Sequence, residues 1–190
     1  MQFRLTYRGP LRANGNVDGK HRIRTWFHVQ LRQLWQQPPL NRLTREGDTI
    51  LARPPVPNKF TTVLEQVDQF WFAPLVTTRL KVVALLDILM LRPESPGAII
   101  LHGGDIDNRL KTLLDALRMP QNADEIPRDW RPGPEEDPFF CLLQDDALVT
   151  SIGVTTDRLL EPREASDVDL VILVTLKGTG ATWLNMELIA

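Results

Sequence analysis

The pattern of apolar and polar positions at the start of the chain predicts a strand followed by a loop. In "FRLTYRG", residues 3–9, the apolar residues Phe3, Leu5 and Tyr7 alternate with polar ones, as in a strand that buries one face. Residues 10–24, "PLRANGNVDGKHRIR", combine Pro, Asn and Gly with several basic side chains. This composition predicts an irregular basic loop on the surface.

A helix and a proline-rich excursion are predicted next. "TWFHVQLRQLWQQ", residues 25–37, spaces its apolar side chains three and four residues apart until two prolines end the pattern. Residues 38–75 contain further prolines and predict an excursion within one domain, because the core pattern resumes afterwards. "LEQVDQFWFAPLV", residues 64–76, suggests a short helix. We expect its aromatic run, residues 70–72, to lie in the core, with an interface role as the alternative.

The middle of the chain predicts buried strands. "RLKVVALLDILMLR", residues 79–92, is a continuous apolar run that fits a strand or a buried helix, and its branched side chains favour the strand. After a turn at "SPG", "AIILH" predicts a second short strand over residues 98–102.

Length and composition favour one domain. A chain of 190 residues with 43% hydrophobic composition suits a single domain over residues 1–190. The longest apolar run is interrupted by Asp87 and is far shorter than a bilayer span, and no secretory leader pattern opens the chain. We therefore expect a soluble, cytoplasmic protein without a membrane partner. The only cysteine, Cys141, excludes an internal disulfide and a thiolate metal site, and its apolar neighbours predict burial.

The charge is unevenly distributed along the chain. Residues 1–60 hold 11 Lys and Arg against 3 Asp and Glu, a balance of +8, whereas residues 61–190 hold 11 against 21, a balance of −10. This asymmetry suits a protein that binds phosphates at one surface and cations beside it.

One segment combines an apolar stripe with polar chemistry. "GGDIDNRLKTLLDAL", residues 103–117, predicts a helix because its leucines fall on one face at about 100° per residue. The opposite face presents Asn108, Lys111 and Asp115, and Asp105 and Asp107 stand where the helix begins. Ordinary structural roles also fit: Asp107 as a helix cap and Lys111–Asp115 as an ion pair four residues apart. A calcium-binding EF-hand loop is excluded because Arg109 occupies a ligand position, and the two glycines are too few for a phosphate loop.

A second acidic element follows. In "LLQDDALVTSIGVTT" the neighbouring Asp145 and Asp146 precede a predicted strand, where two unpaired buried acids are costly. If the fold gathered these carboxylates beside Asp105 and Asp107, the oxygen cluster would suit Mg²⁺.

Together these elements resemble a known family. The pattern D-x-D-N-x-x-K-x-x-x-D-A-L, followed by an apolar segment and a D-D pair, resembles that of the RusA-type Holliday junction resolvases. The order of elements is also similar, including a last strand at "VDLVILVTL", residues 168–176. The resemblance implies an α+β fold, a small mixed or antiparallel sheet with helices packed on it. It also implies a homodimer, a bacterial or phage source, and Mg²⁺-dependent hydrolysis of phosphodiester bonds in four-way DNA junctions during recombination and repair, with Mn²⁺ as a substitute.

The resemblance also implies roles for individual residues. Asp105, Asp107 and Asp146, with Asp145 beside them, match metal-binding positions, and Lys111 matches a catalytic lysine. From its position, Asn108 would orient a carboxylate ligand or, equally well, bond locally to the backbone. Asp115 could also support the ligands, but its ordinary role as partner of Lys111 is the favoured one. The basic loop matches the one that faces DNA, so four of its residues are candidate phosphate contacts: Arg12, Lys20, Arg22 and Arg24.

The connection between the two acidic elements is long for this family and contains an acidic, proline-rich loop around residues 120–138. Two other functions remain open. One is a non-catalytic DNA-binding or phage-derived module that keeps the fold, and the other is a phosphohydrolase acting on small molecules.

Overall fold

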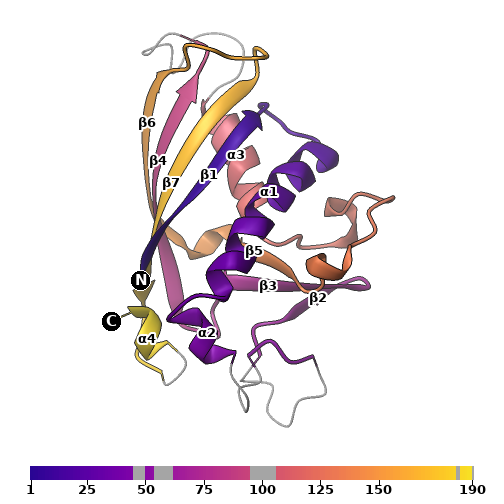
Figure 1. Cartoon of the computed structure of the whole chain (residues 1–190), viewed down its shortest axis with the longest axis vertical. Helices are drawn as coiled ribbons and strands as arrows, with labels where there is room; N and C mark the ends of the chain where they lie inside the picture. The colour runs from indigo at the N-terminus through magenta and orange to yellow at the C-terminus, as the bar shows by residue number, and fades with distance from the viewer. Residues whose placement is uncertain (45–49, 54–61, 95–105, 183–184, 190) are drawn as a thin grey trace.

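Two mixed β-sheets form the framework of the protein (Figure 1). The computed structural model describes residues 1–44, 50–53, 62–94, 106–182 and 185–189. The four-stranded sheet has the order β1-β7-β4-β6, and its strands are β1 (Gln2–Pro10), β7 (Asp167–Gly178), β4 (Val82–Arg92) and β6 (Val149–Arg158). The three-stranded sheet has the order β2-β3-β5, and its strands are β2 (Glu65–Val67), β3 (Phe70–Val76) and β5 (Phe139–Leu143). Each sheet contains one parallel pair, β4 with β6 and β3 with β5.

Two long helices cover one face of the four-stranded sheet (Figure 1). They are α1 (Val17–Trp35) and α3 (Ile106–Leu117), which contact each other, while α1 also contacts β1 and β5. Shorter helical segments are α2 (Leu40–Leu43), α4 (Met186–Ile189), η1 (Ala123–Glu125), η2 (Pro134–Glu136) and η3 (Asp146–Leu148). The combination confirms the predicted α+β class with helices packed on a small mixed sheet.

The alternation of side chains along the strands places the main core between this sheet and the two helices. Leu86 and Ile172 of the sheet and Phe27 and Leu113 of the helices are all almost fully buried. A smaller apolar cluster lies against the acidic, proline-rich loop of residues 120–138, called the acidic segment below. Phe72, Phe139 and four other apolar residues pack together there. The expectation that the aromatic run belongs to the core is confirmed for Phe72.

Most of the predicted elements are present. The strand patterns at residues 3–9, 79–92 and 168–176 correspond to β1, β4 and β7, and the strand after the D-D pair is β6. The leucine-rich helix is α3, and Cys141 is buried in β5 as expected. The strand expected over residues 98–102 lies outside the described residues.

The predicted basic loop over residues 10–24 is wrong in its second half. Helix α1 begins at Val17, because the side chain of Asn16 caps it by accepting a hydrogen bond from the Gly19 N–H at 2.9 Å. The apolar stripe also starts earlier than expected, since Ile23 is buried one turn before Phe27. Three of the basic residues therefore lie on a helix: Lys20, Arg22 and Arg24.

The short helix expected over residues 64–76 is also wrong. The segment forms β2 and β3, which are joined by a turn at Asp68, where the backbone φ is 54°. A run of five consecutive buried positions at the end of β3 explains the error, because a strand covered on both faces loses the alternation that identifies it. Pro74 is accommodated within β3 next to Cys141 of β5.

In the described part of the chain, no helix is long and apolar enough to cross a membrane.

Candidate functional site

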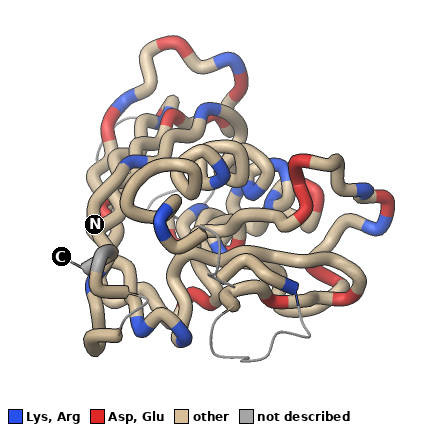
Figure 2. The backbone as a smooth tube through the Cα atoms, turned by 60° about the horizontal axis from the view of Figure 1, so that its bottom comes forward, with Lys and Arg blue, Asp and Glu red and all other residues tan. Residues whose placement is uncertain are grey.

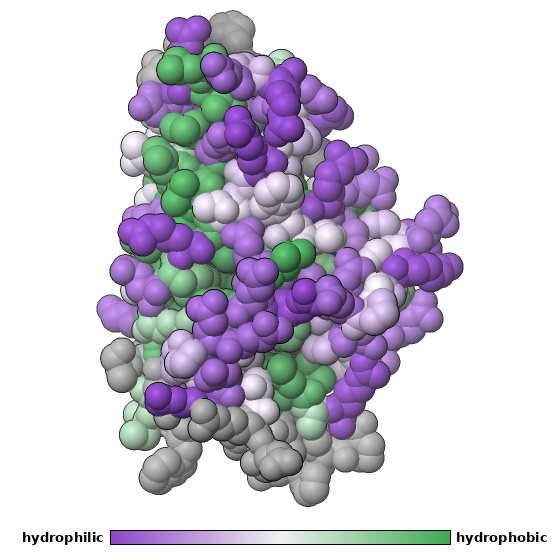
Figure 3. Space-filling model, viewed as in Figure 1, coloured by the Kyte–Doolittle hydropathy of each residue, from purple (hydrophilic) through white to green (hydrophobic). Residues whose placement is uncertain are grey.

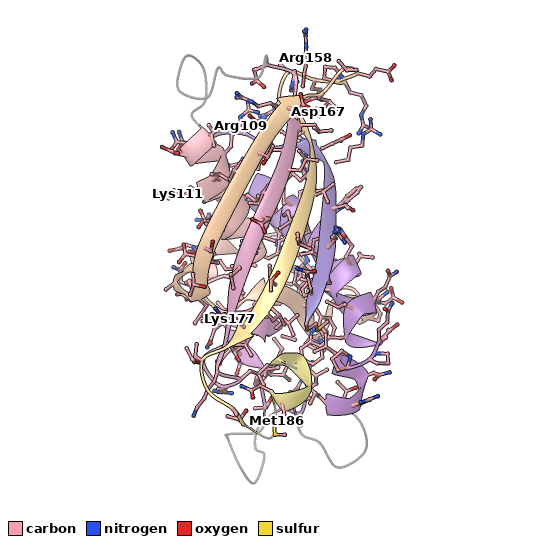
Figure 4. The ribbon with its side chains drawn as sticks, turned by 90° about the vertical axis from the view of Figure 1, so that its left-hand side faces the viewer. Arg109, Lys111, Arg158, Asp167, Lys177 and Met186 are labelled. Carbon is pink, nitrogen blue, oxygen red and sulfur yellow. The ribbon has the colours of Figure 1, made fainter. Side chains whose placement is uncertain are left out.

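The predicted polar residues in the first half of α3 differ in their exposure to solvent. Asp107 and Lys111 are exposed, and Asn108 is half-buried. Figure 4 shows Lys111 projecting outward from α3 beside the four-stranded sheet. Within the described residues, neither Asp107 nor Lys111 belongs to an ion pair. Both charges are therefore accessible to a ligand.

Asp115 does not pair with Lys111, and that expectation is wrong. The Asp115 carboxylate instead lies 2.6 Å from Nζ of Lys20 on α1 and 3.1 Å from Nη2 of Arg118. Burial acts to raise the pKa of Asp115, but the hydrogen bonds and positive charges of Lys20 and Arg118 outweigh it and lower the pKa. Asp115 is a buried structural residue because this face of α3 is turned toward α1 and not toward solvent.

Arg24 is likewise part of the interior. Its residue is 2% exposed, and its guanidinium donates hydrogen bonds to the backbone oxygens of Arg118 at 3.1 Å and Asp115 at 2.9 Å. Burial of the guanidinium lowers the pKa of Arg24. The prediction that Arg24 contacts DNA is wrong, because its side chain fastens α1 to the end of α3.

These contacts show what sequence reasoning missed. Lys20, Asp115, Arg118 and Glu125 form a chain of ion pairs that links α1, α3 and the acidic segment. The only signal in the sequence was the spacing of three residues between Asp115 and Arg118, which places both on one helix face. Other cations near the N-terminus also pair with later acids, for example Arg32 with Glu135. Figure 2 accordingly shows basic and acidic positions close together, so much of the charge asymmetry is neutralised within the fold.

Two of the predicted basic residues remain accessible. Arg12 and Arg22 are exposed, and both line a cleft of about 530 Å³ between the β1–α1 loop and the start of α1. The cleft is also lined by Asn14, Asn16 and Thr112 and by two acidic residues, Asp18 and Glu164, so its two guanidinium groups stand beside two carboxylates. Arg12 and Arg22 are the cationic groups of this lining that could contact a phosphate.

The loop that carries Arg12 is attached directly to α3. The Gly15 N–H donates a hydrogen bond to Oγ1 of Thr112 at 3.0 Å. A Cβ atom at Gly15 would lie only 2.6 Å from Cγ2 of Thr112, so the approach requires glycine. Thr112 follows Lys111, and Asn108 stands one turn earlier on the same face. The cleft therefore adjoins α3 at Thr112, one residue past Lys111.

The pair Asp145–Asp146 lies elsewhere. Asp145 caps η3, where its Oδ1 accepts a hydrogen bond from the Ala147 N–H at 2.8 Å, and Asp146 is exposed. Two residues before this pair, the Leu143 oxygen accepts a hydrogen bond from the Met119 N–H at 2.9 Å, just beyond the end of α3. From Asp107 to that end, the helix rises by about 16 Å.

The contacts of β4 also place the start of α3 and the Asp145–Asp146 pair far apart. Val149, directly after η3, pairs with Ala84 near the start of β4, whereas Arg109 at the start of α3 pairs with Glu94 just past the end of β4. The structure thus places Asp107 and the Asp145–Asp146 pair at opposite ends of α3.

A metal site can be tested against these positions only in part. Across the residues that the structure describes, no group of three or more His, Cys, Asp or Glu side chains lies close enough to hold a metal ion. Asp105 lies outside those residues. The donor type fits Mg²⁺, which binds through one or two carboxylates and the phosphates of a substrate. Of the predicted cluster, the structure therefore describes one carboxylate at the start of α3, that of Asp107.

Comparison of the chain with models of known protein families found no match, and a search of curated proteins found none either.

Proposed function

We propose that this protein is a Mg²⁺-dependent endonuclease that hydrolyses phosphodiester bonds in branched DNA, with four-way junctions as its preferred substrate. The sequence pattern from Asp105 to Leu117 supports the proposal through its resemblance to the RusA-type resolvases. The exposed charges of Asp107 and Lys111, which form no ion pair with another described residue, support it through their chemistry, since both groups could meet a phosphate and its cation.

One observation carries the proposal furthest, namely the docking of the basic loop on α3. The hydrogen bond between Gly15 and Thr112 joins the loop that bears Arg12 to the helix that bears Asp107 and Lys111. A nuclease needs this combination, in which cationic groups hold the sugar–phosphate backbone while acidic groups stand beside the bond to be hydrolysed.

Each side chain has a defined task in the proposal. Arg12 and Arg22, which line the cleft, would bind phosphates of the DNA backbone, and Lys111 would neutralise charge that develops on the phosphate under attack. Asp105 and Asp107 hold the cation, whose contribution is to acidify a bound water and stabilise the phosphate oxygens. Mn²⁺ supports the same chemistry because its oxygen coordination is similar.

The proposal is tested by cleavage of a labelled four-way junction and of a linear duplex, in Mg²⁺, in Mn²⁺ and in EDTA. We expect nicks in the junction strands with either metal and no cleavage in EDTA. Asp107→Asn should lower the cleavage rate by about a hundredfold or more, because it removes a charged ligand. Asp124→Asn, at an exposed acid in η1, is the matched control and should cleave normally. Hydrolysis of small phosphate esters without affinity for DNA would contradict the proposal.

A non-catalytic DNA-binding module is the second candidate function. The separation of Asp107 from Asp145 and Asp146 favours it, because the described carboxylates do not converge on one ion. Binding to the junction with a steep salt dependence, but without cleavage in Mg²⁺ or Mn²⁺, would support the module.

A further inference from the structure

Trp26 of α1 is the only exposed aromatic side chain in the part of the chain that the structure describes, and the residue is 49% exposed. Its indole N–H donates a hydrogen bond to the Thr6 oxygen at 2.9 Å, and its ring meets the Tyr7 ring edge-on at a centroid distance of 5.8 Å. These two contacts hold the indole in one orientation. A planar ligand can therefore stack on it at little cost in conformational entropy, because the ring is already ordered.

The fold does not depend on Trp26 to satisfy the backbone of Thr6. β1 lies at the edge of the described four-stranded sheet, and the side chain of Gln30 bonds its backbone there. Gln30 Oε1 accepts a hydrogen bond from the Thr6 N–H at 2.9 Å, and Gln30 Nε2 donates one to the Thr6 oxygen at 2.8 Å. The exposure of the indole is therefore not explained by a structural role at this edge.

Trp26 lines a depression of about 330 Å³ beside the end of β1. The other lining residues are Gly9, Pro10 and two residues of each charge: Arg8, Arg163, Glu164 and Asp167. The Asp167 carboxylate accepts hydrogen bonds from the backbone N–H groups of Arg163 and Glu164, at 2.9 and 3.2 Å. Because the charges of the lining balance, a ligand here would be held by the aromatic surface and not by net charge.

The depression adjoins the cleft that Arg12 and Arg22 line. Pro10 and Glu164 line both. Arg22 and Trp26 are both exposed and stand four residues apart on α1, so they project from the same face of the helix with their Cβ atoms about 6 Å apart. Figure 3 shows that hydrophilic side chains predominate over α1 on this side of the molecule. An isolated aromatic ring beside guanidinium groups suits a ligand that carries both a planar ring and a phosphate.

We propose that Trp26 stacks on an unpaired base of the DNA strand whose phosphates contact Arg12 and Arg22. The inference rests on the proposed function for its ligand, because it takes a DNA strand as the occupant of the cleft. A base leaves the stack at the smallest cost where pairing is already interrupted, as at the branch point of a junction. Every base has a π-face, so Trp26 would favour opened DNA without reading its sequence.

Stacking and phosphate contacts differ in their dependence on salt. Each phosphate contact with a single strand displaces counterions and contributes about 0.7 to the slope of log affinity against log salt concentration, whereas a stacked base displaces none. Trp26 and Arg22 should therefore weaken binding in two distinguishable ways when they are removed, although they stand one helical turn apart.

The test measures binding of two single-stranded probes by fluorescence anisotropy over a range of salt concentrations, in EDTA. One probe is an oligothymidylate, and the other has the same length and phosphates but abasic sites in place of the bases. Wild type should bind the oligothymidylate about tenfold more tightly than the abasic probe. Trp26→Ala should lose this preference and leave the salt slope unchanged. Arg22→Ala should weaken both probes alike and lower the slope by about 0.7.

Two further variants separate stacking from structure. Trp26→Phe keeps an aromatic ring but lacks the N–H that bonds Thr6, so it should retain most of the preference for bases. Val29→Ala is the matched control, because Val29 is an apolar residue of the same helix with a similar exposure, 45%, and it should bind both probes like wild type. A loss in Trp26→Phe as large as that in Trp26→Ala would assign the effect to the hydrogen bond and overturn the inference.

The remaining outcomes separate this inference from the nuclease proposal. Equal binding of the oligothymidylate by wild type and Trp26→Ala would overturn the stacking role even if the protein cleaves junctions, and would leave Trp26 as a contact for another protein. A preference for bases that depends on Trp26, in a protein that does not cleave junctions in Mg²⁺ or Mn²⁺, would support the stacking role and contradict the nuclease. A wild type that binds neither probe nor junction DNA would overturn both.

Discussion

Lys20 Nζ lies 2.6 Å from Asp115 Oδ2, and this contact joins the first turn of α1 to the last turn of α3. Asp115 also receives a hydrogen bond from Arg118 at 3.1 Å, and Arg118 is paired with Glu125 as well, so two carboxylates balance two cations. Both partners of Asp115 are largely shielded from water. The Lys20–Asp115 ion pair therefore holds α3 in place against α1. It thereby also sets where Asp107 and Lys111 lie relative to the cleft.

Replacing Asp115 by Asn should destabilise the protein by about 3 kcal/mol, because partly buried Lys20 would lose its described counter-charge and Arg118 would keep only Glu125. The low pKa of Asp115 adds a pH dependence: its contribution to stability is present above the unfolded-state pKa near 3.8 and is lost as the pH falls through the lower folded-state pKa. Urea unfolding at neutral and acidic pH measures both effects. Asp124→Asn, an exposed control, should unfold like wild type, and an equal loss in both variants would contradict the assignment.

His21, the residue after Lys20 in α1, should also make the stability of the protein depend on pH. Burial against Trp130 and Phe139, together with the nearby charge of Arg24, lowers the pKa of His21 to about 4. A histidine kept neutral in the fold contributes stability that is complete above the unfolded-state pKa of 6.5 and declines as the pH falls toward 4. We expect a loss of up to about 3 kcal/mol across this window.

The measurement is the free energy of unfolding of wild type and His21→Phe between pH 7 and pH 4.5, conditions chosen to span the window. The aromatic replacement keeps the packing but cannot be protonated, so its stability should depend less steeply on pH. Parallel pH profiles for the two proteins would show that His21 is already accessible to protons in the folded state.

The sequence predicted those elements whose side chains face two different environments. β1 and α3 each bury one face, and their periodicity identified them correctly. β3 is buried on both faces, so its pattern carried no period and was mistaken for a helix. The composition of residues 10–24, with Pro10, Asn14 and Gly15, predicted a loop at the start of α1, because the cap at Asn16 becomes evident only in the structure.

The exposure of the candidate residues on α3 was easier to predict than their arrangement in space. Asp107 and Lys111 were recognised from their spacing and are exposed on α3 as expected. In the sequence, Arg24 and Asp115 look like any charged surface residues. Only the packing of α1 against α3 shows that both are buried. The position of Asp146 depends on how the long connection through β5 returns to the sheet, which no local pattern records.

Gly15 should be required for the loop that carries Arg12 to dock on α3. In Gly15→Ala the new Cβ would lie 2.6 Å from Cγ2 of Thr112, which displaces the loop that carries Arg12. We expect affinity for junction DNA to fall by about tenfold, a loss similar to that of one or two phosphate contacts. Filter binding or fluorescence anisotropy at fixed salt measures this change.

The matched rescue is the double variant Gly15→Ala with Thr112→Ser, which removes the clashing methyl group and keeps the hydroxyl that accepts the Gly15 N–H bond. It should recover most of the affinity. Gly133→Ala, where the added Cβ meets nothing closer than 4.0 Å, should bind DNA normally. A single variant with wild-type affinity would remove the loop from the DNA-binding surface.

The two acidic elements should contribute unequally to cleavage. Asp107 stands in the first turn of α3, beside Lys111, whereas Asp146 lies beyond the far end of that helix. We therefore expect Asp107→Asn to reduce junction cleavage by about a hundredfold and Asp146→Asn to reduce it by less than about tenfold. Single-turnover cleavage at saturating Mg²⁺ separates the chemical step from metal affinity. Equal losses would mean that the bound DNA brings Asp146 to the start of α3, because a carboxylate that far from the cation cannot otherwise matter as much as one beside it.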